Sequence, residues 1–252
     1  MLFWLVASRG GCATSRVFQT DWYQWRAHSS VRRIRQGQDN MVDCPACVRE
    51  PTDMLLVLDI EYASDGRTSV RKTRGNGSSI LSSTGAAVAS NYVMESGIHY
   101  AEFQITAGIC LIGIVLPMPN LDPRRYVNGH FSFTRRQLHD DFMAARSEDW
   151  GVDNVLAYNV HACEYDCEDG GVISTDWGGG HAEWDEWEGM EKCNPGNTVG
   201  MMLDLDEGKL SVYKNNRRLG VMKDELSGSY CWFARIFESS AVSIKRGKTP
   251  MT

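Results

Sequence analysis

The chain lacks a long apolar run. Its opening, MLFWLV, has only six apolar residues, too few for a membrane span or for the core of a normal signal peptide. It also lacks a G-x-S-x-G element, a Gly-rich phosphate loop followed by Lys, and a dinucleotide-binding fingerprint. These absences argue against a membrane protein and against the common nucleophilic and nucleotide-dependent enzymes. We therefore expect no cofactor and no membrane partner.

Positive charge is scarce in most of the chain. Residues 1–49 hold seven Arg, no Lys and three Asp, a net charge of +4, whereas residues 50–252 hold 19 basic and 29 acidic residues, a net charge of −10. Binding to nucleic-acid phosphates needs clustered positive charge, so the composition argues against a nucleic-acid partner. An acidic body favours a partner of basic character.

Dense cysteine spacing is missing as well. The eight Cys are spread along the chain, unlike those of a small disulfide-stapled secreted protein. Several lie inside apolar runs, where a reduced thiol behaves as a small buried hydrophobic group. We therefore expect an intracellular protein of the cytoplasm or the nucleus.

The first 51 residues show no clean hydrophobic period. They combine aromatic residues with Arg and form, in our interpretation, an irregular basic N-terminal segment ahead of a domain over residues 52–248 and a short tail, residues 249–252. An Arg-rich, acid-poor start is also typical of an organelle transit peptide. A poorly structured tail and an inaccurate start of the gene model remain as alternatives.

From about residue 55 the pattern changes to short β-like runs separated by turn residues. The runs include LLVLDIEY (55–62), TSVRKT (68–73), AAVASNYV (86–93), GIHYAEFQI (97–105), CLIGIVLP (110–117), YCWFARIF (230–237) and AVSIKRG (241–247). VGMMLDLDEGKLSVYKNNRRLGVM (199–222) alternates apolar and polar residues and turns at Asp206–Gly208 and at Asn215-Asn216. Only residues 135–146 have a helical spacing, and they predict one short surface helix. Many short strands predict an all-β, two-sheet antiparallel sandwich.

In order, GIHYAEFQI with LIGIV, VGMMLDLDEGKLSVYKNNRRLGV, and YCWFARIF with AVSIKRG resemble the hallmark segments of the SPRY domain. The resemblance covers about residues 55–247, with a long insertion between Pro117 and Val155. SPRY hairpins commonly have Gly where this chain has Asn216, and Asn also tolerates the left-handed turn conformation. The resemblance implies a concanavalin-like jelly-roll sandwich without catalytic residues. It also implies that loops at one end bind a protein or a short peptide, in some members as an adaptor.

The resemblance places partner-binding residues in three loops. By their position in the motif order, these are Arg74 and Asn76 in the first, Arg124, Arg125 and Tyr126 in the second, and Phe237 and Glu238 in the third. Aromatic and Arg side chains in such loops are the usual anchors of a protein interface. Any single one of them can equally be an ordinary solvated loop residue.

The stretch HAEWDEWEGME (181–191) suggests another class of function. Glu183, Asp185 and Glu188 have the spacing of the catalytic carboxylates of laminarinase-like glycoside hydrolases, in which two carboxylates act as nucleophile and acid/base. Neighbouring Trp residues could also serve a carbohydrate-binding module. However, the flanking Gly residues predict a loop, and the order of the surrounding segments matches SPRY. We keep a hydrolase or carbohydrate-binding sandwich as the alternative function.

Two groups of residues suggest a metal. His161, Cys163 and Cys167 have even spacing along one strand, but a structural zinc site needs four ligands and no fourth is evident. Cys44 and Cys47 form a lone C-x-x-C pair without the βαβ context of a redox motif. We therefore predict no metal site. The sequence does not indicate an oligomeric state.

Overall fold

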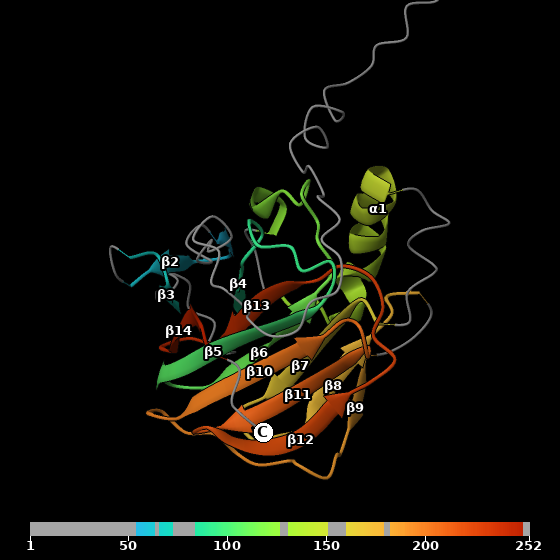
Figure 1. Cartoon of the computed structure of the whole chain (residues 1–252). Helices are drawn as coiled ribbons and strands as arrows, with labels where there is room; N and C mark the ends of the chain where they lie inside the picture. The colour runs from blue at the N-terminus through green and yellow to red at the C-terminus, as the bar shows by residue number, and fades with distance from the viewer. Residues whose placement is uncertain are drawn as a thin grey trace, which may run out of the picture. The chain divides into compact units, whose positions relative to one another are not determined.

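The computed structural model describes residues 54–63, 66–72, 84–126, 131–150, 160–178 and 182–248. All of them lie in one compact unit, Cys47–Thr252. The described part of the chain forms two antiparallel sheets of seven strands each, in the orders β1-β4-β13-β6-β7-β8-β9 and β12-β11-β10-β5-β14-β3-β2 (Figure 1). The predicted all-β, two-sheet antiparallel sandwich is therefore confirmed.

The strands of the first sheet are β1 (Leu55–Val57), β4 (Gly85–Val88), β6 (Cys110–Val115), β7 (Ala162–Asp166), β8 (Val172–Thr175), β9 (Glu183–Asp185) and β13 (Cys231–Ile236). Those of the second sheet are β2 (Ile60–Tyr62), β3 (Ser69–Lys72), β5 (Ile98–Ala107), β10 (Thr198–Asp204), β11 (Lys209–Lys214), β12 (Arg217–Lys223) and β14 (Ala241–Arg246). In the described part of the insertion there are two short 3-10 helices, η4 (Pro123–Tyr126) and η5 (Arg136–Leu138), and the helix α1 (His139–Trp150).

The main core lies between the two sheets. Phe103 of β5 and Trp232 of β13 meet edge to face across it, with ring centroids 6.1 Å apart. Along β5, Ala101, Phe103 and Ile105 are buried, whereas Gln104 and Thr106 are exposed and Glu102 is half-buried. This period of two residues is the one expected of a strand that has one face against a core.

The central strands of the first sheet are buried on their other face as well. In β13, Trp232 and Ala234 belong to the core between the sheets, while Cys231 and Phe233 belong to a second apolar cluster. The insertion supplies four of the six aromatic residues of that second cluster, Tyr126, Phe131, Phe133 and Phe142. This is why β6 is buried at all six of its residues and shows no alternation in its sequence.

The insertion helix begins and ends four residues later than predicted. The sequence pattern placed it at residues 135–146, but η5 precedes α1, which spans His139–Trp150. It is also more than a surface element, because Phe142 is fully buried and its ring centroid lies 5.1 Å from that of Trp177. The backbone N–H of Thr134 and its hydroxyl both bond to neighbouring side chains, which fixes the approach to the helix.

The apolar run at residues 55–62 was predicted as one strand, and that prediction is wrong. Leu58 and Asp59 have φ angles of 62° and 52°, in the left-handed region, and they turn the chain from β1 in the first sheet to β2 in the second. The Leu58 carbonyl accepts a hydrogen bond from Lys72 Nζ at 3.0 Å, which holds this corner in place. A pattern of apolar residues alone does not reveal such a change of sheet.

The two predicted turns of the C-terminal hairpins are present. Asn215 and Asn216 have φ angles of 49° and 66°, as a two-residue turn with both centres in the left-handed region requires. Gly208 has φ 66° in the preceding turn, and a Cβ there would lie 2.7 Å from the Leu226 carbonyl oxygen. Both turns fix the register of β10, β11 and β12.

We predict that Phe142→Ala lowers the free energy of unfolding by about 3–5 kcal/mol, the usual cost of truncating a fully buried aromatic ring. Chemical denaturation of the full chain measures this. The control is Asp140→Ala on the exposed side of the same helix, which should cost less than about 1 kcal/mol. Equal, small losses in both variants would mean that the insertion does not pack on the sheet.

Candidate functional site: loops at one end of the sandwich

Two of the three predicted loops can be located directly. Arg74 and Asn76 lie outside the described residues, but Lys72 and Thr84, which border the first loop, are described. Lys72 is the last residue of β3, and Thr84 immediately precedes β4. Their contacts indicate at which end of the sandwich β3 ends and β4 begins.

Lys72 connects the end of β3 to two other turns. Its backbone N–H donates to the Ser240 carbonyl at 3.1 Å, in the turn between β13 and β14. Its buried ammonium group donates to the Leu58 carbonyl and lies 4.0 Å from an Asp59 carboxylate oxygen. Burial lowers the pKa of Lys72, and the negative charges of Asp59 and Glu238 oppose that effect. The β1–β2 corner and the β13–β14 turn therefore meet at the start of the first loop.

Thr84 connects the other border of that loop to the insertion. The Phe131 backbone N–H donates to the Thr84 carbonyl at 3.0 Å, and the Thr84 hydroxyl donates to the Phe131 carbonyl at 2.9 Å. The next residue, Ser132, accepts a hydrogen bond from Arg235 Nη1 at 2.7 Å. The Arg235 guanidinium in turn lies over the Phe237 ring, 5.9 Å from its centroid. The insertion and the third predicted loop are thus joined at the same end.

A buried ion pair stands beneath these contacts. Glu164 of β7 is fully buried, and its Oε1 atom lies 3.0 Å from Arg235 Nη2 and accepts a hydrogen bond from the Thr134 hydroxyl at 2.7 Å. Burial raises the pKa of the Glu164 carboxyl, while Arg235 and Thr134 oppose that rise. Removing one partner of such a pair leaves an uncompensated buried charge, which is costly. The pair therefore ties the insertion to the central strands of the first sheet.

The structure divides the residues of the second predicted loop into two kinds. Arg124 and Arg125 of η4 are exposed, and Arg124 forms a two-bond contact with the Asp122 carboxylate at 2.9 and 3.0 Å. Tyr126 is buried, and its ring centroid lies 4.9 Å from that of Phe131 in the second core. Its ring thus supports the loop from beneath and is not positioned to contact a partner. The η4 segment packs beside β1.

Phe237 and Glu238 lie in the turn between β13 and β14. The Phe237 side chain is half-buried, and Glu238 is exposed. Next to this turn the sequence reasoning missed Ile109, which is 38% exposed in the β5–β6 turn. Its backbone N–H donates to Ser240 Oγ at 2.9 Å. In the sequence, Ile109 is an apolar residue directly after Gly108, and nothing there indicates that it is exposed. Its exposure depends on how the β13–β14 turn packs beside it.

The carboxylates of the hydrolase alternative lie elsewhere. Glu183 and Asp185 are exposed on β9, which is an edge strand, and Glu188 is exposed in the following loop. They belong to a stretch, residues 147–191, that has 13 acidic residues and neither Lys nor Arg. A retaining hydrolase needs one carboxylic acid of raised pKa and one ionised carboxylate facing each other in a cleft. Exposed charges on an edge strand instead discourage pairing with another chain.

The Trp residues of the same stretch have structural contacts. The indole N–H of Trp187 donates to the Gly170 carbonyl at 2.8 Å, and its ring packs against the main core. A Cβ at Gly189 would lie 2.2 Å from the Trp187 ring, so Gly is required there for close packing. Trp184 is 47% exposed and lies against Gly171. The Trp187 ring therefore covers the main core at one edge of the sandwich.

The residues considered as zinc ligands are dispersed. The His161 ring packs on Trp177 at 5.0 Å between centroids, Cys163 lies in the main core, and Cys167 faces Cys110. Within the described ranges, no three His, Cys, Asp or Glu side chains are placed to hold a metal ion. Cys44 and Cys47 lie outside those ranges.

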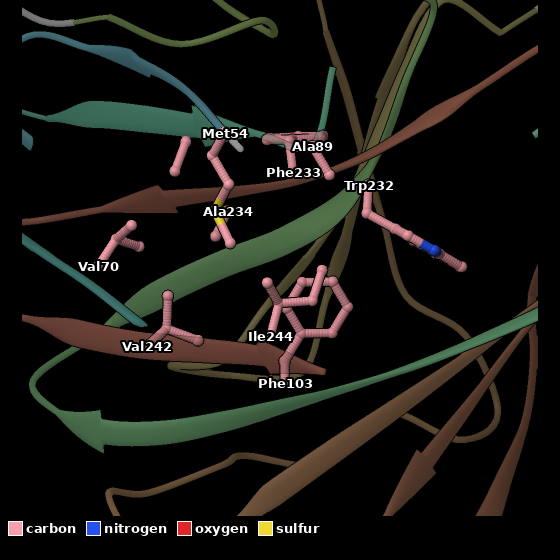
Figure 2. Close-up of a pocket in the computed structure, with 10 residues that line it drawn as sticks. Met54, Val70, Ala89, Phe103, Trp232, Phe233, Ala234, Val242 and Ile244 are labelled. Atoms are coloured by element: carbon pink, nitrogen blue, oxygen red, sulfur yellow. The ribbon is translucent and has the colours of Figure 1, made fainter. Parts of the chain in front are cut away.

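A small void lies between the two sheets near β1 and β3. It has a volume of about 10 Å³, close to the lower limit for one water molecule. Side chains of both sheets line it, including Met54, Val70, Phe103 and Trp232 (Figure 2). The lining is apolar and offers a ligand no polar group for orientation, so the void is a packing defect of the core.

Comparisons with known proteins give the following picture. No family model matches the chain, and no curated protein matches it. Among solved structures, the SPRY domain of human HERC1 is similar, with 14% identity and a TM-score of 0.46 over 77% of this chain and 97% of that domain. The TRIM65 PSpry domain has 15% identity and a TM-score of 0.44 over 74% of this chain and 83% of that domain.

Both structures are SPRY domains. They belong to the family that the sequence segments resemble, and at such low identity the likeness concerns the fold alone. The described part of the chain contains no helix that is long and apolar enough to cross a membrane.

We predict that Glu164 favours the folded state more at acidic than at neutral pH. Because its pKa is raised in the folded state, its contribution is fully present below the unfolded pKa of about 4.3 and is lost as the pH rises through the folded pKa. The difference in free energy of unfolding between wild type and Glu164→Gln should therefore shift in favour of Glu164→Gln from pH 4 to pH 7. A difference that does not change with pH would contradict this.

Proposed function

We propose that this chain binds a protein or a short peptide, without catalysis, through the loops at the end of the sandwich where β3, the insertion and the β13–β14 turn meet. The observation that carries the proposal is the convergence of three segments that are far apart in sequence. Lys72 bonds to the β13–β14 turn, Thr84 bonds to the insertion, and Arg235 joins that insertion to Phe237. Loops on a rigid frame are where proteins commonly carry binding residues.

The proposed contact residues are those whose side chains are exposed to solvent, wholly or in part. Arg124, Arg125 and Glu238 are exposed and Phe237 is half-buried, so at least part of each side chain can reach a partner. Ile109 adds an exposed apolar side chain beside the same turn. Arg74 and Asn76, which lie between Lys72 and Thr84 and outside the described residues, complete the proposal. A few aromatic, apolar and Arg anchors surrounded by weaker contacts are typical of an interface of this kind.

The partner that we propose has basic character, since residues 50–252 carry a net charge of −10. Opposite net charges speed the encounter of two proteins more than they tighten the complex. If the protein is an adaptor of the cytoplasm or the nucleus, an effector would bind to another surface or through another chain.

To test the loops, the full chain is used to capture proteins from a cell extract, which are identified by quantitative mass spectrometry. Each captured protein is then purified, and its direct binding is measured. We predict that Arg125→Ala combined with Phe237→Ala weakens the binding of a true partner by about tenfold or more, because interface anchors typically contribute 1–3 kcal/mol each.

The matched control carries Arg218→Ala and Val93→Ala, which truncate an exposed Arg and an exposed apolar residue elsewhere on the sandwich. Circular dichroism and thermal melting verify that both double variants are folded. Equal binding by wild type and both variants would reject the loop assignment. Loss of binding in the control alone would move the interface to another face.

The hydrolase and carbohydrate-binding alternative is tested separately. Because Glu183, Asp185 and Glu188 are exposed at a sheet edge, we predict that the wild-type chain releases no reducing sugar from β-glucans and does not bind them. Release by the wild type that Glu183→Gln abolishes would establish the alternative instead. Binding without release would indicate a carbohydrate-binding module.

A further inference from the structure

Two buried thiols face each other where β6 begins and β7 ends. The Sγ atoms of Cys110 and Cys167 lie 3.7 Å apart, and both side chains are fully buried or nearly so, at 0% and 1% exposure. The register pairs Leu111 with Asp166, so Cys110 stands opposite Cys167. The Cys167 backbone N–H donates to the Cys110 carbonyl at 3.2 Å, which fixes this pairing.

The backbone geometry of this pair suits a disulfide. Residues paired in this way on antiparallel strands have Cα atoms about 5.5 Å apart, within the most common range for disulfides. The sulfur atoms would have to approach from 3.7 Å to about 2.05 Å, which small side-chain rotations provide.

We propose that Cys110 and Cys167 form a cross-strand disulfide when the protein meets a low-molecular-weight disulfide such as glutathione disulfide. One protein thiolate attacks a glutathione sulfur and releases one glutathione thiolate, which takes up a proton. The second protein thiol then loses its proton and attacks the mixed disulfide, releasing the second glutathione. The protein loses two protons and two electrons in total, and one glutathione disulfide becomes two glutathione molecules.

Burial keeps the pair reduced under reducing conditions. It raises the pKa of the Cys167 thiol well above its usual value, so little of the reactive thiolate is present at neutral pH. The exposed residues nearest to the pair in sequence are Glu168 and Asp169 of the β7–β8 turn, which directly follow Cys167. Turns at strand ends open locally at lower cost than the centre of a sheet. The reaction is therefore slow and limited by this opening.

A third thiol, that of Cys193, is an alternative disulfide partner for Cys167. The Cys193 backbone N–H donates to the Cys167 carbonyl at 2.9 Å, and its thiol lies 3.4 Å from the Tyr165 hydroxyl oxygen. That thiol already has a hydrogen-bond partner in Tyr165, whereas the Cys110 sulfur directly meets that of Cys167. The geometry therefore favours Cys110 over Cys193 as the partner of Cys167.

The disulfide would lie at the same end as the proposed binding loops. Cys110 follows Ile109, whose backbone N–H bonds to Ser240 in the β13–β14 turn. A covalent link between β6 and β7 would limit local opening beneath that turn. Formation of the bond does not depend on partner binding, so it can fail or succeed independently of the proposed function.

In the experiment, the full chain is incubated with glutathione disulfide, its free thiols are alkylated under denaturing conditions, and the peptides are mapped by mass spectrometry. We expect a Cys110–Cys167 link and a thermal midpoint about 5–10 °C higher, because a disulfide of this kind mainly restricts the unfolded chain. Addition of dithiothreitol should reverse both effects.

The variants Cys110→Ser and Cys167→Ser should lose both the link and the shift in midpoint. The matched control is Cys231→Ser, which removes a thiol that is equally buried in β13 and should keep both. The proposal is overturned if the wild type keeps Cys110 and Cys167 as free thiols. Mixed glutathione adducts alone, or a link from either residue to another cysteine, would overturn it as well.

Discussion

The burial of the central strands of the first sheet on both of their faces is the constraint on which the rest of the structure depends. Trp232 and Ala234 of β13 face the second sheet, while Cys231 and Phe233 face the insertion. A sheet covered on one side only would need polar residues on the other, and β6 has none among its six buried residues. The insertion is therefore a structural layer of the domain, and it brings Phe131 and Ser132 to the edge of the proposed binding end.

Polar contacts determine the positions of the loops relative to the two sheets. The Glu164–Arg235 pair lies beneath the insertion, and Arg235 extends the connection to Phe237 in the third loop. Apolar packing is nondirectional, whereas charge-assisted hydrogen bonds specify one geometry. The insertion and the β13–β14 turn are for this reason held together.

Individual residues show which features could be predicted from the sequence and which could not. The hairpin turn at Asn215-Asn216 was predicted because local backbone preferences decide it. Tyr126 was expected at a partner-binding surface but lies in the second core, since an aromatic residue in a loop has the same sequence signature in either place. Ile109 was missed for a related reason: its exposure depends on a turn more than a hundred residues away in the sequence.

By itself, the sequence determined the all-β sandwich, most of its strands and the absence of clustered positive charge in the body, because these follow from hydrophobic period, turn residues and composition. Tertiary structure alone decided the change of sheet at Leu58 and Asp59, the second core under the insertion, and the meeting of Cys110 with Cys167. It also placed Glu183 and Asp185 at an exposed edge. Each of these features depends on contacts between segments that are far apart in the chain, so local sequence patterns do not predict it.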